Sequence, residues 1–352
     1  MKRALITSLS VVLITFINIA FMGGIYEAAA KGRVARDFGL MDKNGDDKIS
    51  VEEWNRRGNF NRLDLDADGY LNLAEVRALY RAAWKENKSS EIKPLAGEIL
   101  TEIDGRVPES LLSKEVRCAI GRFRKCDPKS SVERGLFPTE LGPVFPRNAS
   151  CRGIDDYYAM PYGFKRKRDS YHGGIDMPAP WGTAMIAIAN GTVVAIFKDD
   201  KSPRGIEIVL RHSPEDTGIP LWIFSAYGHL DRLPDIVVGQ KVVMGQVLGP
   251  TGNSGISPKT GKQNKGRRPA IHFSTLYSTS KQYSESQNII IPLKGYWLDP
   301  NAFYRGKVPL DTAAMKALPN IEKAVPIPVM FEDGSTNPPN TKLVWPYTCR
   351  QE

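Results

Sequence analysis

Four histidines occur in this chain of 352 residues, and two of them stand in surroundings that suit a metal site. His172 lies in the stretch YHGGIDMPAP, which places Asp176 four residues later, and His272 lies in AIHF. Two imidazoles, one carboxylate and an open fourth position are typical of catalytic rather than structural zinc sites. Zinc in such a site polarises a carbonyl group and lowers the pKa of its water, so that hydroxide is available near neutral pH. These residue types therefore predict hydrolytic zinc chemistry.

The segments that carry these residues are expected to be turns and strands. Two glycines and a proline follow His172 and disfavour a helix there, whereas a glycine-permitted turn can fold the carboxylate of Asp176 back toward the imidazole. In the strand around AIHF, side chains alternate between the two faces. Ala270, His272 and Ser274 should therefore share the face of the metal site.

Residues 151–310 as a whole show short strands separated by glycine turns. AMIAIA and TVVAIF flank Asn190-Gly191, which predicts a two-residue hairpin. Further strands are expected in GIEIVLRH, LWIFSAYGHL, KVVMGQVLG and AIHFSTLY, with no helix among them. We predict a mostly β domain, an antiparallel β-sandwich or partly open barrel, followed by a C-terminal extension over residues 311–352.

The order of these motifs resembles that of the lysostaphin/LytM-type zinc metallopeptidases, which cut the peptide cross-links of peptidoglycan. The resemblance covers residues 155–305, through HxxxD with its trailing PAPWGT, then NGTV, YGHL, VGQKVVMGQVLGPTGNSG and the final HF. It implies that His172, Asp176 and His272 bind zinc. It also implies that His229, in YGHL, orients water or stabilises the oxyanion beside the metal, and that peptidoglycan is the substrate.

One position departs from the family pattern. The last motif of the family is HxH, and its first position is Ala270 here. Alanine can neither give nor take a proton, and a general acid or base typically contributes about 10²–10⁴-fold to a rate. Two hypotheses stay open: a zinc endopeptidase that relies on His229 or on a group from the preceding loop, and a non-catalytic envelope protein that binds peptidoglycan or regulates another hydrolase. The fourth histidine, His212, is expected on the surface or at a strand end and is assigned no role.

Two copies of one acidic loop pattern precede this domain, in DKNGDDKISVEE and DLDADGYLNLAE. An EF-hand loop supplies calcium with oxygen ligands from positions 1, 3, 5, 7, 9 and 12 and turns sharply at position 6. The second loop has Gly69 there and the first has Asp47, a residue type that tolerates positive φ, so we expect the first loop to bind more weakly. Ile49 and Leu71 stand where paired loops touch. The expected ligands are Asp42, Asn44, Asp46, Lys48 (carbonyl), Ser50 and Glu53, then Asp64, Asp66, Asp68, Tyr70 (carbonyl), Asn72 and Glu75.

The alternative for these loops is a pair of solvated acidic turns. Their close spacing resembles compact bacterial EF-hand or dockerin-like modules, which implies a structural or adhesive part rather than a sensor. We assign residues 31–90 to this small calcium-binding helical module, with a helix over 76–90. We expect residues 91–150 to form a linker or strap, with a helix near 109–125. An inhibitory segment is a third possibility that the sequence does not distinguish from these two.

The N-terminus and the charge indicate export. Lys2 and Arg3 precede an apolar run and three alanines, which predicts a signal peptide over residues 1–30. Because the apolar run is nearly long enough to span a bilayer, an uncleaved membrane anchor stays open. The rest of the chain is then periplasmic, associated with the cell envelope, or secreted. The net charge of +9 favours anionic envelope polymers as partners, and no nucleic acid is expected; the oligomeric state is left open.

Two further features concern cysteine and basic residues. Four cysteines in an exported protein are expected to be oxidised; of three possible pairings we favour Cys118–Cys126, close in sequence, and Cys151–Cys349, which flank one domain. Basic runs precede both ligand segments and either line a groove that attracts the carboxylates of peptidoglycan or are solvated loops. These runs are Lys165, Arg166, Lys167 and Arg168, then Lys259, Lys262, Lys265, Arg267 and Arg268.

Overall fold

The computed structural model describes residues 38, 42–50, 52–53, 68–73, 104–153, 159–166, 170–198, 202–257, 260–263, 267–308 and 310–352. Its contacts divide the chain into two units, Met1–Ala82 and Ala83–Glu352, and each is described by itself. The predicted signal peptide and the predicted helix over 76–90 lie outside the described residues. Within the described ranges, no helix is long and apolar enough to cross a membrane.

In the N-terminal unit, two short strands bring the two acidic loops together. β1 (Lys48–Ile49) pairs antiparallel with β2 (Leu71–Asn72), and Ile49 lies opposite Leu71. Both side chains are fully buried, which confirms their predicted contact. Asp47 has φ 60° and Gly69 has φ 85°, so the aspartate does adopt the backbone conformation that position 6 requires.

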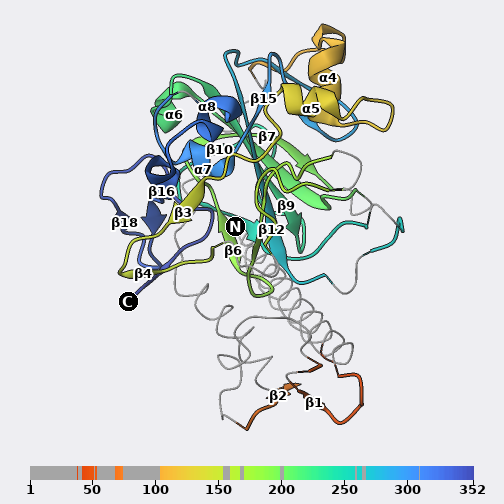
Figure 1. The fold of residues 1–352 in the computed structure, drawn as a ribbon, viewed down its shortest axis with the longest axis vertical. Helices are drawn as coiled ribbons and strands as arrows, with labels where there is room; N and C mark the ends of the chain where they lie inside the picture. Colours follow the sequence, from red (N-terminus) through yellow and green to blue (C-terminus); the bar gives the residue numbers. More distant parts are fainter. Residues whose placement is uncertain are drawn as a thin grey trace, which may run out of the picture. The chain divides into compact units, whose positions relative to one another are not determined.

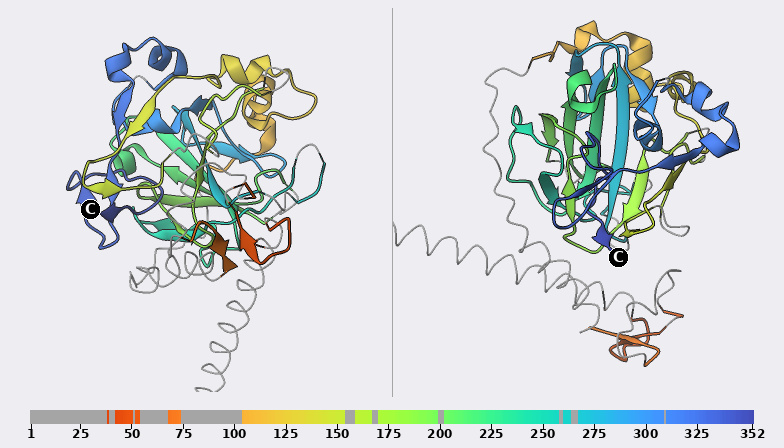
Figure 2. Two further views of the ribbon diagram at one scale, coloured as in Figure 1. Left: turned by 60° about the horizontal axis from the view of Figure 1, so that its bottom comes forward. Right: turned by 90° about the vertical axis from the view of Figure 1, so that its left-hand side faces the viewer.

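The larger unit is built on one antiparallel sheet of seven strands (Figure 1), which confirms the predicted mostly β class. β9 runs along one edge of β12, while β5 and then β15 pair with the other edge. The long central strands lie side by side in Figure 2. Six strands follow one another across the sheet as β10 (Lys241–Val242), β7 (Gly191–Phe197), β8 (Ile206–His212), β9 (Trp222–Leu230), β12 (Ala270–Ser278) and β15 (Tyr296–Leu298), and the seventh is β5 (Ile175–Pro178).

Strand β12 shows why its sequence places the site on one face. Ile271, Phe273 and Thr275 are fully buried, whereas His272 and Ser274 between them are only partly buried. The apolar residues pack into the main core with Ile175 and other strand residues. Alternation along a strand therefore leaves the even-numbered residues for the opposite face, as predicted.

The hairpin predicted at Asn190-Gly191 is wrong. The strand before it, β6 (Ala184–Ile186), pairs with β11 (Val247–Pro250), whereas β7 pairs with β8 and β10. A type I′ turn needs positive φ at both central residues, and neither Asn190 nor Gly191 has one. The side chain of Asn190 instead accepts a hydrogen bond from the backbone N–H of Met244 (2.8 Å), and the chain passes into a second sheet.

Short helices and strands complete the unit. The helix predicted near 109–125 is confirmed as η1 and α4, but the expectation of no helix among the strands up to AIHFSTLY misses α6. The helices are η1 (Glu109–Leu111), α4 (Lys114–Gly121), α5 (Lys129–Glu133), α6 (Pro214–Thr217), α7 (Pro300–Phe303), α8 (Thr312–Lys316) and η2 (Asn320–Glu322). Two further antiparallel pairs are β13 (Tyr283–Glu285) with β14 (Ile290–Pro292) and β17 (Val329–Met330) with β18 (Thr336–Asn337).

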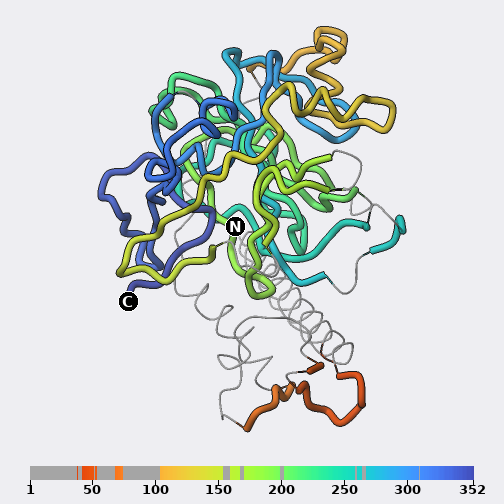
Figure 3. The backbone as a smooth tube through the Cα atoms, viewed as in Figure 1, coloured from red at the N-terminus to blue at the C-terminus, as the bar shows by residue number. Residues whose placement is uncertain are grey.

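The segment before the seven-stranded sheet packs against it and against the C-terminal residues (Figure 3). β3 (Gly142–Val144) pairs parallel with β16 (Ala324–Pro326), and β4 (Ala149–Ser150) pairs antiparallel with β19 (Arg350–Gln351). The indole N–H of Trp297 donates to the carbonyl of Ala119 in α4 (3.0 Å). Residues 104–150, called the strap below, thus contact both the sheet and the C-terminal residues, and the assignment of residues 91–150 to a linker or strap stays a prediction.

Both favoured disulfides are present. Cys118 is bonded to Cys126 and Cys151 to Cys349. The first closes a loop after α4, and the second joins the end of the strap to the C-terminal residues. No free cysteine remains in the chain.

Asp299 connects the strap to the segment that follows β15, and its burial makes the free energy of unfolding depend on pH. It caps α7 by accepting from the N–H of Asn301 (2.8 Å), and the hydroxyl of Thr139 donates to its other oxygen. Burial raises the pKa of Asp299 from 3.8 to about 6, although both hydrogen bonds oppose the shift. The folded state therefore binds the carboxyl proton of Asp299 more tightly than the unfolded state does. The stabilisation that the protonated carboxyl gives to the fold is present in full below pH 4 and is lost as the pH rises through 6.

Asp299→Asn is therefore expected to stabilise the protein relative to the wild type by ~1–3 kcal/mol more at pH 7.5 than at pH 4.5. Asparagine keeps an acceptor for the cap but cannot ionise. Urea unfolding of both proteins at the two pH values measures this difference. An equal effect of the substitution at both values would show that the Asp299 carboxyl ionises normally in the fold.

Candidate metal centre

His172, Asp176 and His272 meet at one point although they come from separate segments. His272 on β12 lies directly opposite Asp176 on β5 in the strand register. Asp176 Oδ1 is 2.8 Å from His272 Nδ1 and 3.3 Å from His172 Nε2, and the two nitrogens are 3.2 Å apart. The structure therefore brings together all three predicted ligands.

Backbone contacts fix the orientation of the first ligand. His172 Nδ1 lies 3.2 Å from the carbonyl oxygen of Pro161, which can only accept. The proton of a neutral ring therefore belongs on Nδ1, and Nε2 keeps its lone pair free toward Asp176 and His272. A carbonyl that sets the tautomer in this way is the usual outer partner of a metal-binding histidine.

Two glycines let the His172 turn approach β12. A Cβ atom on Gly174 would lie 2.5 Å from the carbonyl oxygen of Phe273, and one on Gly173 would lie 2.6 Å from the ring of Trp297. Neither glycine has positive φ. The predicted glycine dependence is thus present, but its cause is close packing rather than a left-handed turn.

The charges at the cluster suit a divalent cation. Burial alone would raise the pKa of Asp176, but the facing His172 and His272 hold it well below its usual range. Burial lowers the pKa of His272 to about 4, against the effect of Asp176. Near neutral pH the site therefore presents an ionised carboxylate and a His272 imidazole that is unprotonated.

The spacing of the donors fits zinc. Zinc bonds to nitrogen and oxygen of about 2.0–2.2 Å place tetrahedral ligand atoms roughly 3.3 Å apart. The three separations of 2.8–3.3 Å agree with that value. Among the described residues, this group of three is the one set of histidine, cysteine and acidic side chains that could hold a metal ion.

His229 lies beside this cluster at the end of β9. Its ring centroid is 5.9 Å from that of His272, and its backbone is held at φ 66°, a conformation that costs energy outside glycine and is often found at functional sites. Its Nδ1 lies 2.8 Å from the carbonyl of Ser254, which assigns the proton to Nδ1. Burial lowers the pKa of His229 well below its ordinary value, and Arg267 adds to this.

Arg267 is the residue at this site that the sequence did not single out. Its Nη2 donates to His229 Nε2, and its Nη1 is 3.3 Å from His229 Nδ1. In the sequence it was one cation among nine in two basic runs. Of the others, Lys167, Arg168, Lys259 and Lys265 lie outside the described residues, so the predicted basic groove stays a prediction.

His212 is not on the surface. It is fully buried at the end of β8, with Nδ1 2.6 Å from the carbonyl of Asn190 and Nε2 2.7 Å from the hydroxyl of Ser225. These bonds satisfy both ring nitrogens. The strand-end position was predicted correctly, and His212 stabilises the packing of β8 on β9.

The first acidic loop is closed around its own carboxylates. Asp42 accepts from the backbone N–H groups of Gly45, Asp46 and Asp47, and Glu53 accepts from those of Lys43, Asn44 and Ser50. Positions 1 and 12 of the loop thus turn inward. Of the second loop, Asp68, Tyr70 and Asn72 are described, whereas Asp64, Asp66 and Glu75 lie outside the described residues.

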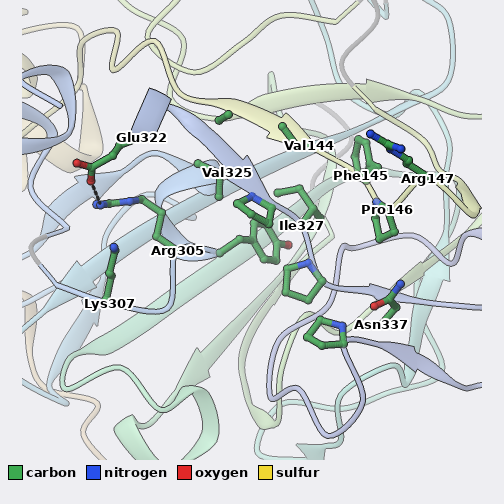
Figure 4. A pocket seen from close by; sticks show the side chains of 15 residues that line it. Val144, Phe145, Pro146, Arg147, Arg305, Lys307, Glu322, Val325, Ile327 and Asn337 are labelled. Atoms are coloured by element: carbon green, nitrogen blue, oxygen red, sulfur yellow. Dashed lines mark ion pairs between the residues drawn. The ribbon is translucent and has the colours of Figure 1, made fainter. Parts of the chain in front are cut away.

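A groove among the described residues lies away from this cluster. It is an open groove of about 680 Å³ between β3, β16 and the residues around Asn337 (Figure 4). Its walls are largely proline and aliphatic side chains, with Arg147, Arg305 and Lys307 at its margins. None of the four histidines lines it, so cavity size does not mark the chemistry.

Comparison with known families gives two matches. The model of peptidase family M23 matches residues 170–284, the segment that carries His172, Asp176, His229 and His272. This segment is an M23 peptidase domain. The model of an EF hand matches residues 35–56, which contain the first acidic loop. A search of the curated proteins gave no match.

Solved structures similar to the M23 domain include the following three. An alanine-to-histidine mutant of the catalytic domain of the prophage-encoded M23 protein EnpA from Enterococcus faecalis is 27% identical, with 38% of this chain and 85% of that chain covered and a TM-score of 0.26. The catalytic domain of lysostaphin from Staphylococcus simulans is 25% identical, with 36% of this chain and 81% of that chain covered and a TM-score of 0.26. LytU is 22% identical, with 45% of this chain and 84% of that chain covered and a TM-score of 0.29.

Proposed function

We propose that residues 151–310 form a zinc-dependent endopeptidase that hydrolyses the peptide cross-links of peptidoglycan. The observation that carries this proposal is the convergence of His172 Nε2, Asp176 Oδ1 and His272 Nδ1 within an M23 peptidase domain. When bound there, zinc would polarise the scissile carbonyl and supply hydroxide near neutral pH. A cell-envelope or secreted location follows from the same substrate.

The chain's own groups supply the rest of the chemistry. His229 carries its proton on Nδ1, toward Ser254, so Nε2 is the nitrogen that can take a proton from the attacking water. The backbone carbonyl of Pro161 accepts from Nδ1 of His172, and that of Ser254 accepts from Nδ1 of His229, so each imidazole is kept in one tautomer. Since general base catalysis needs a correctly placed lone pair, this fixed orientation favours an enzyme.

A non-catalytic envelope protein is the second candidate, and Ala270 favours it. This residue lies on the same strand face as His272 and offers no proton. Arg267 also occupies the lone pair of His229 Nε2 in this structure. A protein that binds peptidoglycan or regulates a hydrolase would keep the fold and the metal without turnover.

Digestion of purified sacculi separates the two candidates. The full chain, loaded with zinc, is incubated with sacculi with and without a chelator, and soluble muropeptides are measured. An endopeptidase releases them only without chelator. A protein that has bound zinc and pellets with the sacculi, yet releases nothing at any concentration, would be the binding protein.

We propose in addition that the N-terminal unit binds calcium through the two predicted loops. Support comes from the EF-hand match and from the inward-turned Asp42 and Glu53 carboxylates. Asp64→Ala is expected to remove the tighter binding step in calorimetric titration, lowering that affinity at least ~10-fold because calcium sites depend on carboxylate number. Asp42→Ala should affect only the weaker step.

Asp333→Ala provides the control for this titration, because Asp333 is an exposed acid in the other unit. It should leave both steps unchanged. A titration in which Asp42→Ala removes the tighter step instead would reverse our ranking of the loops.

A further inference from the structure

Arg267 is held in place at the metal centre rather than free in solvent. Its carbonyl accepts from the side-chain amide of Asn253 (2.8 Å). Two residues later, the carbonyl of Pro269 accepts from the N–H of Ala179 (3.2 Å), and the N–H of Ala270 donates to Gly252 (3.1 Å). Contacts from both sides of the site therefore fix the backbone that carries the guanidinium.

Among the described residues, the guanidinium has no acidic partner of its own. Its side-chain hydrogen bond goes to His229 Nε2, because His229 Nδ1 carries its own proton toward Ser254. A guanidinium stays protonated in proteins, so this is a permanent positive charge that is partly buried against a neutral imidazole. Such an arrangement lowers stability, and departures of this kind are expected at functional sites.

The donors that remain on Arg267 are suited to a developing negative charge. One of its N–H groups donates to His229 Nε2, and a guanidinium carries five N–H groups in all. Burial lowers the pKa of Arg267 and the charge of Asp176 opposes this, but Asp176 is already bonded to His272. The remaining N–H groups therefore belong to a charged side chain that contacts His229 beside the metal centre.

We infer that Arg267 is a catalytic residue that donates hydrogen bonds to the carbonyl oxygen of the scissile peptide. The inference rests on the endopeptidase function proposed above. As the oxygen of water bonds to the carbonyl carbon, the π electron pair moves onto the carbonyl oxygen, which Arg267 stabilises. The pair then returns as the C–N bond breaks, and the leaving nitrogen receives the proton that water gave up.

Arg267 also links this step to His229. It donates to His229 Nε2, the nitrogen that would accept the proton from water. When the guanidinium turns to the substrate oxygen, that lone pair becomes available. Arg267 therefore supplies a charged donor to a site in which Ala270 supplies none.

The test compares Arg267→Ala and Arg267→Lys with the wild type on a soluble cross-linked muropeptide. Loss of one oxyanion donor typically lowers kcat by about 10²–10³-fold, which we expect for alanine with KM changed less than ~3-fold. Lysine keeps the charge and should retain part of the rate. Arg147→Ala, which removes the same charge at the margin of the distant groove, should leave kcat unchanged.

Zinc affinity gives a measurement independent of turnover. Because Arg267 repels cations, Arg267→Ala should bind zinc as tightly as the wild type or more tightly, in competition with a chelating dye. A phosphinate analogue of the cross-link, whose anionic oxygens resemble the attacked carbonyl, should bind this variant on the order of 10²-fold more weakly. Wild-type kcat in the alanine variant, or a zinc affinity that falls together with kcat, would overturn the inference.

The double variant Arg267→Ala/Ala270→His tests whether a donor at position 270 can replace the donor at position 267. We expect it to be at least ~10-fold faster than Arg267→Ala alone, because a histidine at 270 restores a donor. Ala270→His in the wild-type background should change kcat little. A large gain in that background with no rescue of the double variant would contradict the inference, whereas an inactive zinc-loaded wild type would refute the endopeptidase function itself.

Discussion

His272→Ala is expected to lower the rate of cross-link hydrolysis on the order of 10⁴-fold. The substitution removes one of three donors that lie within 2.8–3.3 Å of one another. A catalytic metal supplies several kcal/mol of transition-state stabilisation, and each 1.36 kcal/mol changes a rate tenfold. Release of muropeptides and bound zinc, measured on the same preparation, should fall together.

Ser274→Ala is the matched control, because Ser274 is two residues along β12 and on the same face. It should keep both zinc and activity. Folding of the His272 variant is checked by thermal unfolding, since an unfolded domain would lose activity for another reason. A folded His272→Ala protein that retains zinc and full activity would exclude this cluster as the active site.

Removal of the Cys151–Cys349 disulfide is expected to give the largest loss of stability. The bond spans 198 residues, and closing a loop of that length restricts the unfolded chain by roughly 5 kcal/mol in the chain-entropy model. The double substitution of both cysteines by alanine should therefore lower the free energy of unfolding by about 3–5 kcal/mol, measured by urea denaturation with tryptophan fluorescence.

The Cys118–Cys126 disulfide offers an internal comparison, because it spans only 8 residues. Its removal should cost about 2 kcal/mol by the same relation. If both pairs of substitutions lowered stability equally, loop length would not govern the contribution of these bonds. Such a result would point to local packing around the cysteines instead.

The sequence predicted the parts of the site that depend on local pattern. Alternation along 270–274 placed His272 and Ala270 on one face, because this effect acts over a few residues, whereas the glycines after His172 were predicted to permit a turn and instead allow close packing. The pairing of Ile49 with Leu71 and the positive φ of Asp47 followed from loop chemistry in the same way.

The errors and omissions concern contacts between distant segments. Asn190-Gly191 has the composition of a hairpin, but Met244 and His212 bind Asn190 from elsewhere in the chain. Arg267 stood in a basic run with no pattern to distinguish it, and its contact with His229 joins residues 38 positions apart. No periodicity or motif spacing encodes such a contact.

The most direct test of the endopeptidase is to count the ends that it creates in purified sacculi. With zinc-loaded protein, new amino groups should appear in step with solubilised material, no new reducing sugar ends should form, and Asp176→Ala should abolish the signal. Intact sacculi in the presence of zinc-loaded wild-type protein, or new reducing ends in place of amino groups, would contradict the assignment.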